Sequence, residues 1–561
     1  MHFDNGTYYS SDKEKFEDFC IHNSLNGPGV TMLSDGTRLE GSFIDSFLYG
    51  NGSSYSSKGD QYHGNYRNNQ MFGYGFYSFE NHDKTVRLLD LPDEILLIII
   101  YKLGSLDVLY SLLNTNQRLD QMARSINNTK FIDFSIELSD GQFSSIDNIK
   151  LDRLCEKILP GIHHNIVGVT FELAYMERIL LAYEYPNLTT IVIVTFSPDI
   201  LLNYLTEGSA ITRLFKEQIK HITIKNEKKV FTNQSFTDVC ARILSICRKC
   251  TYLDMNQWIT NRSSTILLHD RFSNICYSSC LHTLFINVKN FEDCLCLLDG
   301  RLNQLSSLTV NINFIKRSSI IDNNQKILSN LKEFSLICYC FITAYDCRIL
   351  PLLHRMTHLN KLTLCLYVIR LTNIEGIDLN ERVLCHMLDL STFIFHICTI
   401  MTTSQTNHFL STNDIQNTFN NWKYSPVSCN IDHFSDGYTY CHIYSIPFKM
   451  SWLMHITNTF RGHCFQFVID LVLYDTRPFE HEFFEWVSQA FPLLKYLTLN
   501  NMMAQEKKRQ IQPVKDKILI SSRLSYMHLI RLRLTRAHID YANQFLYHDN
   551  AYIPRLHTLR I

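Results

Sequence analysis

Long hydrophobic runs are missing from this chain. No apolar run in its 561 residues approaches the roughly 18 residues that a membrane span requires. The first residues, MHFDNGTYYSSDKEKFEDF, contain neither the basic segment nor the apolar stretch of a secretory signal. The 18 cysteines are spread along a chain without such a signal, which favours reduced thiols over disulfides. These absences predict a soluble cytoplasmic protein, with the nucleus as the alternative.

An excess of either charge is also missing. The formal net charge is −1, so electrostatics gives no reason to expect a nucleic-acid partner or an anionic membrane. Hydrophobic residues make up 45% and charged residues 19%, as in folded globular proteins. A chain of this length exceeds what one hydrophobic core organises. Several domains are therefore expected.

Signatures of catalysis are missing as well. The chain contains no Gly-x-Ser-x-Gly, Walker or protein-kinase sequence, and HEFFE at 481–485 lacks the second histidine of a zinc protease. Cys247 and Cys250, followed by Cys276 and Cys280, leave zinc as an alternative. Cys250 occupies an apolar position of the leucine pattern described below, which favours a core thiol. We therefore expect a protein without enzymatic activity, metal or cofactor.

Glycines in the first section recur at a fixed interval of 23 residues. Each unit opens with an aromatic or aliphatic residue and contains two strand-like pieces around a Gly-x-Gly turn. Such self-similarity indicates stacked supersecondary units, and the glycines suit turns that need a positive φ. The two glycine series are Gly27, Gly50 and Gly73, and Gly29, Gly52 and Gly75.

This section, roughly residues 3–80, resembles the MORN repeat, whose pattern is Tyr-x-Gly, then Gly-x-Gly, then an aromatic residue. Residues 62–79 match the pattern best, whereas Asp18 replaces a glycine and Ser54 replaces an aromatic residue. The resemblance implies a non-catalytic array of β-hairpins over residues 1–86 that binds proteins or, in some members, phospholipids. Weak lipid contact is the lesser alternative, because the section has no dense Lys/Arg stripe. A Gly/Tyr-rich loop region is the other alternative.

A short helical segment follows, LLDLPDEILLIIIYKLGSLDVLYSLLNTNQRLDQMA at residues 88–123. Asp90 can cap a helix, Pro92 suits the first turn, and Asp93 and Glu94 suit the positive end of the helix dipole. Apolar residues then recur at helical spacing, and two further short helices are expected from Ser105 and from about residue 116. Three helices in so short a segment bury little surface alone, so the segment needs a neighbour.

The same segment resembles an F-box, with Leu91-Pro92-x-Glu94-Ile95-Leu96 as its most specific part. The resemblance covers residues 87–135 and implies docking on the Skp-type adaptor of a cullin–RING ubiquitin ligase. Thr115-Asn116 and Leu119 stand where many F-boxes have Val-Cys and an aromatic residue, which reduces the expected contact area. The alternative is a helical linker that packs wholly within the chain. The resemblance assigns the adaptor contact to Leu91, Pro92, Ile95, Leu96, Ile99, Leu103, Leu109 and Leu113.

A second pattern, Leu-x-x-Leu-x-Leu, runs through the remaining chain from about residue 186. Its first four occurrences, such as Leu188-Ile191-Ile193 and Ile219-Ile222-Ile224, are spaced by 31 residues. Strands alternating with helical stretches predict a degenerate leucine-rich solenoid over residues 136–561, with an irregular insertion near 400–450. A less regular α/β domain is the alternative. Residues between the apolar positions are expected on a concave target-binding face, namely Thr190, Thr223, Thr283, Thr309, Lys361, Thr363, Thr498 and Arg531.

The whole order of segments resembles the F-box/leucine-rich-repeat class of ligase receptors. The fold expected is a β-hairpin MORN array, then a three-helix F-box, then an α/β leucine-rich solenoid. The function expected is that of a substrate-recognition subunit of an SCF-type cullin–RING E3 ligase, which holds an unknown target protein for ubiquitination. The competing hypothesis is a non-catalytic scaffold built from the two kinds of repeat. A variant of this hypothesis has the scaffold recruited to a membrane.

Overall fold

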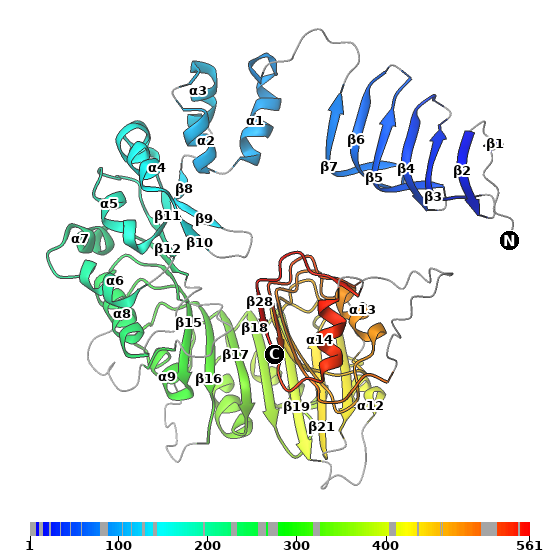
Figure 1. Cartoon of the computed structure of the whole chain (residues 1–561). Helices are drawn as coiled ribbons and strands as arrows, with labels where there is room; N and C mark the ends of the chain where they lie inside the picture. The colour runs from blue at the N-terminus through cyan, green and yellow to red at the C-terminus, as the bar shows by residue number, and fades with distance from the viewer. Residues whose placement is uncertain are drawn as a thin grey trace. The chain divides into compact units, whose positions relative to one another are not determined.

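The computed structural model describes the chain in two compact units, Met1–Lys102 and Leu103–Ile561. Fourteen α-helices and several sheets lie in the described residues, which confirms a mixed helix and strand architecture in more than one domain (Figure 1). None of the described helices combines the length and the apolar character needed to cross a membrane. The description omits residues 1–6, 10–14, 22–23, 34, 45, 58, 79–87, 104, 114, 126–129, 138–142, 195–196, 226–232, 256–264, 268–278, 318–325, 403–410, 435–436, 461, 463, 507–523 and 548–549.

The first unit contains a seven-stranded sheet in which every strand pairs with the next in the chain. All of these pairings are antiparallel, so the sheet is a series of hairpins. Its small core packs Leu39, Phe43, Leu48, Tyr62 and Tyr66 together. The strands are β1 (Thr7–Tyr9), β2 (Lys15–Ile21), β3 (Ser24–Met32), β4 (Arg38–Ile44), β5 (Phe47–Tyr55), β6 (Gln61–Arg67) and β7 (Gln70–Ser78).

The repeated glycines form one row across five strands of this sheet, because Gly29 pairs with Gly41, Gly41 with Gly52, Gly52 with Gly64, and Gly64 with Gly75. A Cβ atom at Gly75 would lie 2.2 Å from the Cζ atom of the Tyr62 ring. The row therefore leaves room for large side chains to cross the strands. In β2 the row ends at Asp18, which pairs with Gly29.

Helices follow the seven-stranded sheet. The first unit ends with α1 (Asp93–Lys102), preceded by the 3₁₀ turn η1 (Leu88–Asp90). The second unit begins with α2 (Ser105–Ser111) and α3 (Gln117–Ser125). The boundary between the two units thus lies inside the predicted segment 87–135, whereas the predicted boundary at 86/87 lies outside the described residues.

A twelve-stranded sheet is the largest element of the second unit. Its strands from β8 to β19 pair in parallel, in chain order except for the small separate pair of β9 (Ser135–Glu137) and β10 (Phe143–Ser145). The parallel strands are β8 (Phe131–Asp133), β11 (Gly168–Glu172), β12 (Thr190–Val194), β13 (His221–Ile224), β14 (Tyr252–Asp254), β15 (Thr283–Asn290), β16 (Ser307–Phe314), β17 (Glu333–Ile342), β18 (Lys361–Ile369) and β19 (Thr392–Thr402).

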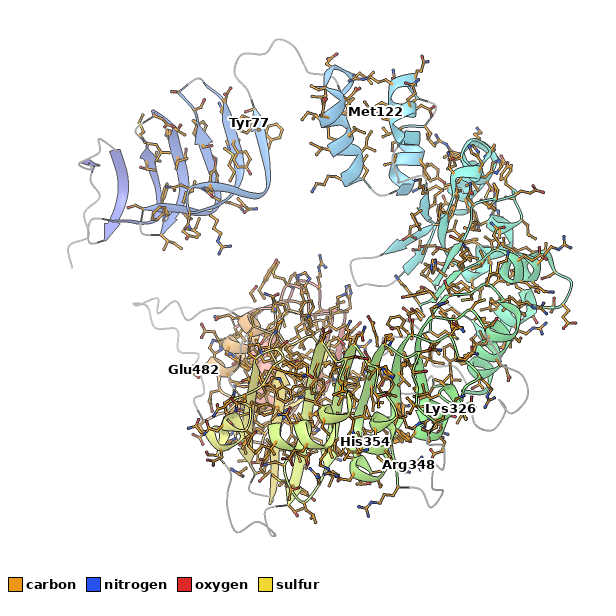
Figure 2. All side chains as sticks on the ribbon, turned by 180° about the vertical axis from the view of Figure 1, so that it is seen from behind. Tyr77, Met122, Lys326, Arg348, His354 and Glu482 are labelled. Atoms are coloured by element: carbon orange, nitrogen blue, oxygen red, sulfur yellow. The ribbon has the colours of Figure 1, made fainter. Side chains whose placement is uncertain are left out.

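Helices connect most of these strands and cover one face of the sheet (Figure 1). Apolar residues such as Ile191, Leu284 and Leu362 are fully buried, and their strand neighbours alternate onto the opposite face. We call that opposite side the helix-free face. Figure 2 labels Arg348, which follows β17 on the helical side. Arg348 pairs with Glu292 at 2.6 Å. The connecting helices are α4 (Asn148–Arg153), α5 (Met176–Leu180), α6 (Pro198–Tyr204), α7 (Ala210–Glu217), α8 (Asn233–Ile246), α9 (Phe291–Leu297), α10 (Leu350–His354) and α11 (Gly376–Arg382).

The parallel part of the sheet ends near residue 400, where an irregular insertion of the solenoid was predicted. The segment predicted as an irregular insertion contains α12 (Thr412–Asn417) and an antiparallel hairpin of β20 (Val427–His433) and β21 (Tyr438–Ser445). β21 pairs antiparallel with β19, which leaves β20 at the edge. An antiparallel edge ends the register of parallel strands, so the chain begins a new sheet after it.

The second sheet has five parallel strands. Leu471, Leu497 and Leu532 lie on its buried face, in one cluster with Phe484 and Phe545 of the helices. The strands are β22 (Trp452–Ile456), β23 (Asp470–Tyr474), β24 (Tyr496–Asn500), β26 (Arg531–Leu534) and β28 (Thr558–Arg560), with the short pair β25 (Leu524–Ser525) and β27 (Ala551–Tyr552) beside helices α13 (His481–Ala490) and α14 (Ile539–Leu546).

The second sheet covers part of the helix-free face of the first. Met454 of β22 packs with Tyr367 of β18 and with Cys398 and Ile400 of β19. The Tyr367 hydroxyl accepts a hydrogen bond from the backbone N–H of Met454 at 2.9 Å. β19 is therefore buried on both faces, as is β18 from Leu364 to Val368, whereas β13 is half-exposed on its helix-free face.

Candidate functional site

An apolar surface lies on and beside α1. Ile95 and Ile98 are 43% and 56% exposed, and Leu88 and Leu89 just before the helix are 46% and 41% exposed. Pro92, on the same segment, is also exposed. Apolar side chains in such numbers on one short helix are typical of a surface that a partner covers.

The eight residues assigned to adaptor docking fall into two groups. Leu91, Pro92, Ile95, Ile99 and Leu103 are exposed or half-buried. The other three, Leu96, Leu109 and Leu113, are buried to 4% exposure or less, so they support the packing of this structure rather than offering free surface. Sequence reasoning did not name Ile98, the most exposed apolar residue among the described side chains of α1, because the F-box resemblance assigned no contact to it.

Six of the eight residues assigned to target binding lie on the helix-free face of the long sheet, in two cross-strand rows. One row includes Thr190, Thr283 and Lys361, and the next row includes Thr223, Thr309 and Thr363. The threonines are half-buried and Lys361 is exposed. Between the threonines of these rows lie aromatic side chains that sequence reasoning did not name, namely His221, Tyr252 and Phe285.

The remaining two target-binding candidates, Thr498 and Arg531, line a pocket on the helix-free face of the second sheet. The pocket has a volume of about 500 Å³ and receives Arg533 from the same strand as Arg531. We call it the arginine pocket. Its other lining side chains include Trp452, His455, Asp470 and Tyr496.

Strand register explains how these side chains meet. Asp470, Tyr496 and Arg531 are direct neighbours across β23, β24 and β26, and Val472, Thr498 and Arg533 form the next row. Alternate residues of a strand share a face, so Arg531 and Arg533 point the same way with Cα atoms about 7 Å apart. Both rows lie opposite the buried leucines of the sheet.

His455 enters the pocket through a bulge. The register of β22 on β23 shifts between Met454 and Ile456, so His455 is an additional residue in its strand. Its φ of 59° lies in the left-handed region, which non-glycine residues seldom adopt. The ring lies 5.2 Å from the ring of Tyr440, stacked on it. Bulges of this kind redirect a side chain, often near functional sites.

Two interactions shape the charge of the arginine pocket. The guanidinium carbon of Arg531 lies 5.1 Å from the centroid of the Tyr496 ring, a cation–π contact that holds the arginine in place. Burial raises the pKa of Asp470 to about 7, although Arg531 and Arg533 act in the opposite direction. At neutral pH the two arginines therefore outweigh a carboxyl group that is only partly ionised.

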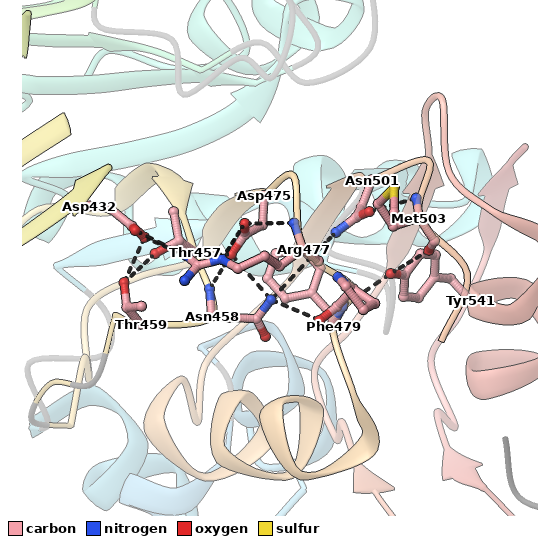
Figure 3. A network of polar contacts seen from close by, with 11 residues as sticks. Asp432, Thr457, Asn458, Thr459, Asp475, Arg477, Phe479, Asn501, Met503 and Tyr541 are labelled. Atoms are coloured by element: carbon pink, nitrogen blue, oxygen red, sulfur yellow. Dashed lines mark hydrogen bonds and ion pairs between the residues drawn. The ribbon is translucent and has the colours of Figure 1, made fainter. Parts of the chain in front are cut away.

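The loops at the ends of these strands are joined by a polar network (Figure 3). Arg477 donates to Asp432 at 3.0 Å and to Asp475 at 3.2 Å. Asn458 donates its backbone N–H to Asp475 at 2.8 Å, and Asn501 donates its side-chain amide to the Arg477 carbonyl at 2.6 Å. The network thus ties strand β20 and the loops after β22, β23 and β24 to one arginine.

Of the cysteines considered for zinc, Cys247 and Cys250 are core thiols, whereas Cys280 is half-buried. Cys247 and Cys250 are buried, and burial raises the pKa of Cys250 to about 12, so the thiol stays protonated. Cys276 lies outside the described residues. Within the described part of the chain, no cluster of three or more His, Cys, Asp or Glu side chains has an arrangement suited to a metal ion.

A scan against models of known protein families and a search of curated proteins found no match to this chain.

Proposed function

We propose that this protein is a non-catalytic receptor subunit of an SCF-type cullin–RING E3 ubiquitin ligase. In this proposal the segment 87–135 is an F-box that docks on a Skp-type adaptor. The helix-free faces of the two parallel sheets bind a target protein. The protein supplies geometry: it raises the effective concentration of target lysines near the ubiquitin donor. The working compartment is the cytoplasm, with the nucleus as the alternative.

The exposed apolar surface of α1 is the observation that carries the proposal. The side chains of Ile95 and Ile98 on this isoleucine-rich helix are 43% and 56% exposed. Contact of this apolar surface with water is unfavourable in free energy. A helix laid into an apolar groove of a partner removes that cost. The Leu-Pro-x-Glu-Ile-Leu sequence at 91–96 adds the resemblance to the F-box at the same place.

The same proposal takes the seven-stranded sheet as a MORN-type array and the two parallel sheets as degenerate leucine-rich repeats. The glycine row through Gly41, Gly52, Gly64 and Gly75 supports the first assignment. Parallel strands that alternate with helices support the second. The array contributes a further protein-binding surface, because Phe76 is 68% exposed.

A scaffold is the second candidate, favoured by the burial of Leu96, Leu109 and Leu113. If those residues serve packing alone, the helical segment joins two interaction modules and recruits no ligase.

Co-purification with a Skp-type adaptor distinguishes the two. We expect the full chain to form a stoichiometric complex, and the double variant I95K/I98K to lose it while keeping the circular dichroism spectrum of the parent. The matched control is I149K on α4, where Ile149 is 75% exposed and far along the chain. A parent chain without adaptor binding, or equal binding by I95K/I98K, would refute the ligase proposal and leave the scaffold.

A further inference from the structure

The arginine pocket has the charge and shape of an anion-binding site. Arg531 and Arg533 project from alternate positions of one strand into a space of about 500 Å³. Both arginines are half-buried, so a bound anion would lose part of its water and gain stronger charge–charge interaction. The contact between Arg531 and the Tyr496 ring fixes one guanidinium before any ligand arrives. A preformed donor of this kind loses little entropy on binding.

The walls of the pocket are apolar and aromatic. Trp452 lies 4.3 Å from Tyr339 between ring centroids, and Met454 is buried against the long sheet. His455 is held among Tyr367, Tyr440 and other rings. These walls are rigid because they are packed into the contact between the two sheets. Such a pocket suits a ligand that joins one anionic group to an apolar neighbour.

We infer that the arginine pocket binds a side-chain carboxylate of an acidic segment of the target protein, with an adjacent apolar residue against Trp452. This inference rests on the proposed target-binding role of the helix-free face. Charge complementarity with Arg531 and Arg533 identifies the occupant. Asp470 lies in the same cross-strand row as Arg531, with Tyr496 between them. Its carboxylate, when ionised, reduces the positive charge of the arginine pocket. When Asp470 is ionised, the two arginines and Asp470 together leave one net positive charge, which a singly charged carboxylate neutralises.

Fluorescence anisotropy with the full-length chain tests the inference. The probe is a labelled twelve-residue peptide in which Glu alternates with Leu, and two reference peptides replace Glu by Gln or by phosphoserine. We expect the Glu peptide to bind at least about 10-fold more tightly than the Gln peptide, with an affinity that falls as salt rises. The R531Q/R533Q variant should lose about 10-fold or more, whereas R555Q, at an exposed arginine outside the pocket, should bind as the parent does.

Several results would overturn the inference. They are absence of binding by the parent chain, equal binding of the Glu and Gln peptides, equal binding by the parent and R531Q/R533Q, or a clear preference for the phosphoserine peptide. A second variant, T498R, adds charge and fills space in the same pocket. If R531Q/R533Q folds poorly, peptide binding by folded T498R replaces it as the test, and binding equal to that of the parent would contradict the inference. Adaptor binding, measured on the same preparations, reports separately on the proposed ligase function.

Discussion

Nε2 of His396 lies 3.1 Å from Nδ1 of His442, and the two rings are stacked with an interplanar angle of 14°. Both side chains are buried, on β19 and β21 beneath the second sheet. Burial lowers the pKa of His396 to about 3, and burial together with His396 and His455 lowers the pKa of His442 well below its usual value. The pair is therefore neutral, with one ring donating and the other accepting.

Acid should destabilise the second unit through this pair. Unfolded histidine binds a proton below about pH 6.5 and the folded pair does not, so the free energy of unfolding falls as the pH is lowered from 6.5. Each histidine contributes up to about 1.4 kcal/mol per pH unit. We expect H396Q, which keeps a polar atom near the Nε2 position, to show a shallower loss of stability in urea unfolding between pH 7 and 5. The control H557Q, at an exposed histidine, should keep the parental slope; an H396Q slope equal to the parent's would contradict the assignment.

Asp470 should act in the opposite direction. Its folded pKa of about 7 exceeds the ordinary value of 3.8, because burial outweighs the attraction of Arg531 and Arg533. The folded chain thus holds an extra proton between those values, and stability falls as the pH rises from about 4 to 7. We expect D470N to be more stable than the parent by about 1–3 kcal/mol at pH 8 and to differ little at pH 4. Urea unfolding at the two pH values measures the difference, with D389N at an exposed position as the control. No gain in stability at pH 8 would show that Arg531 and Arg533 offset the burial of the Asp470 carboxylate.

Arg477 should be essential to the loop network. It serves two carboxylates, of which the Asp432 side chain is 4% exposed and the Asp475 side chain is 0% exposed. Removing the arginine leaves buried charge without its cation, which is strongly destabilising. We expect R477A to cost about 2–4 kcal/mol in unfolding free energy, and R555A to cost less than about 0.5 kcal/mol. The double variant R477A/D432N should recover part of the loss; a loss for R477A no larger than for R555A would show that the network is only a surface feature.

The positions of most parallel strands in the second unit could be predicted from the sequence, because the same apolar spacing recurs at each of them. The centres of the leucine pattern, such as Leu253, Leu308 and Leu559, lie on strands throughout. Several strands were missed, among them β11 and β22, for different reasons. β11 carries the same spacing at Ile166, Val169 and Phe171 and lies before the point where the pattern was first sought, whereas the bulge at His455 breaks the spacing in β22.

Only two residues of the arginine pocket were predicted, because not every outward-facing position of its strands was considered. Thr498 and Arg531 were chosen as residues beside apolar positions, but only one such position was taken from β24 and from β26, and none from β23. Applying the rule to both positions of each strand would have named Tyr496, Arg533 and Asp470 as well. The covering of β19 by the second sheet could not be predicted in this way, because it depends on contacts between Met454, Tyr367 and Cys398 that are remote in sequence.

Glycine can be needed in the first unit for two reasons, lack of room for a side chain or a positive φ, and two substitutions distinguish them. At Gly75 a Cβ atom would lie 2.0 Å from the Tyr62 hydroxyl oxygen, while at Gly50, with φ of 74°, it would meet nothing within 4 Å. G75A should therefore destabilise the sheet by about 1–3 kcal/mol through overpacking, and G50A by about 1–2 kcal/mol through its backbone conformation. Hydrogen exchange of peptides from β6 and β7 in the full chain measures both.

Shortening the crowded side chain tests the cause. Tyr62 is 8% exposed and supplies the ring that occupies the space beside Gly75. In Y62L the ring end is absent, so G75A in that background should cost little, whereas G50A should cost as much as before. Additive losses for Y62L and G75A would mean that the glycine row serves backbone freedom alone. A specific rescue would establish that the 23-residue repeat preserves glycine to make room for the tyrosine that crosses it.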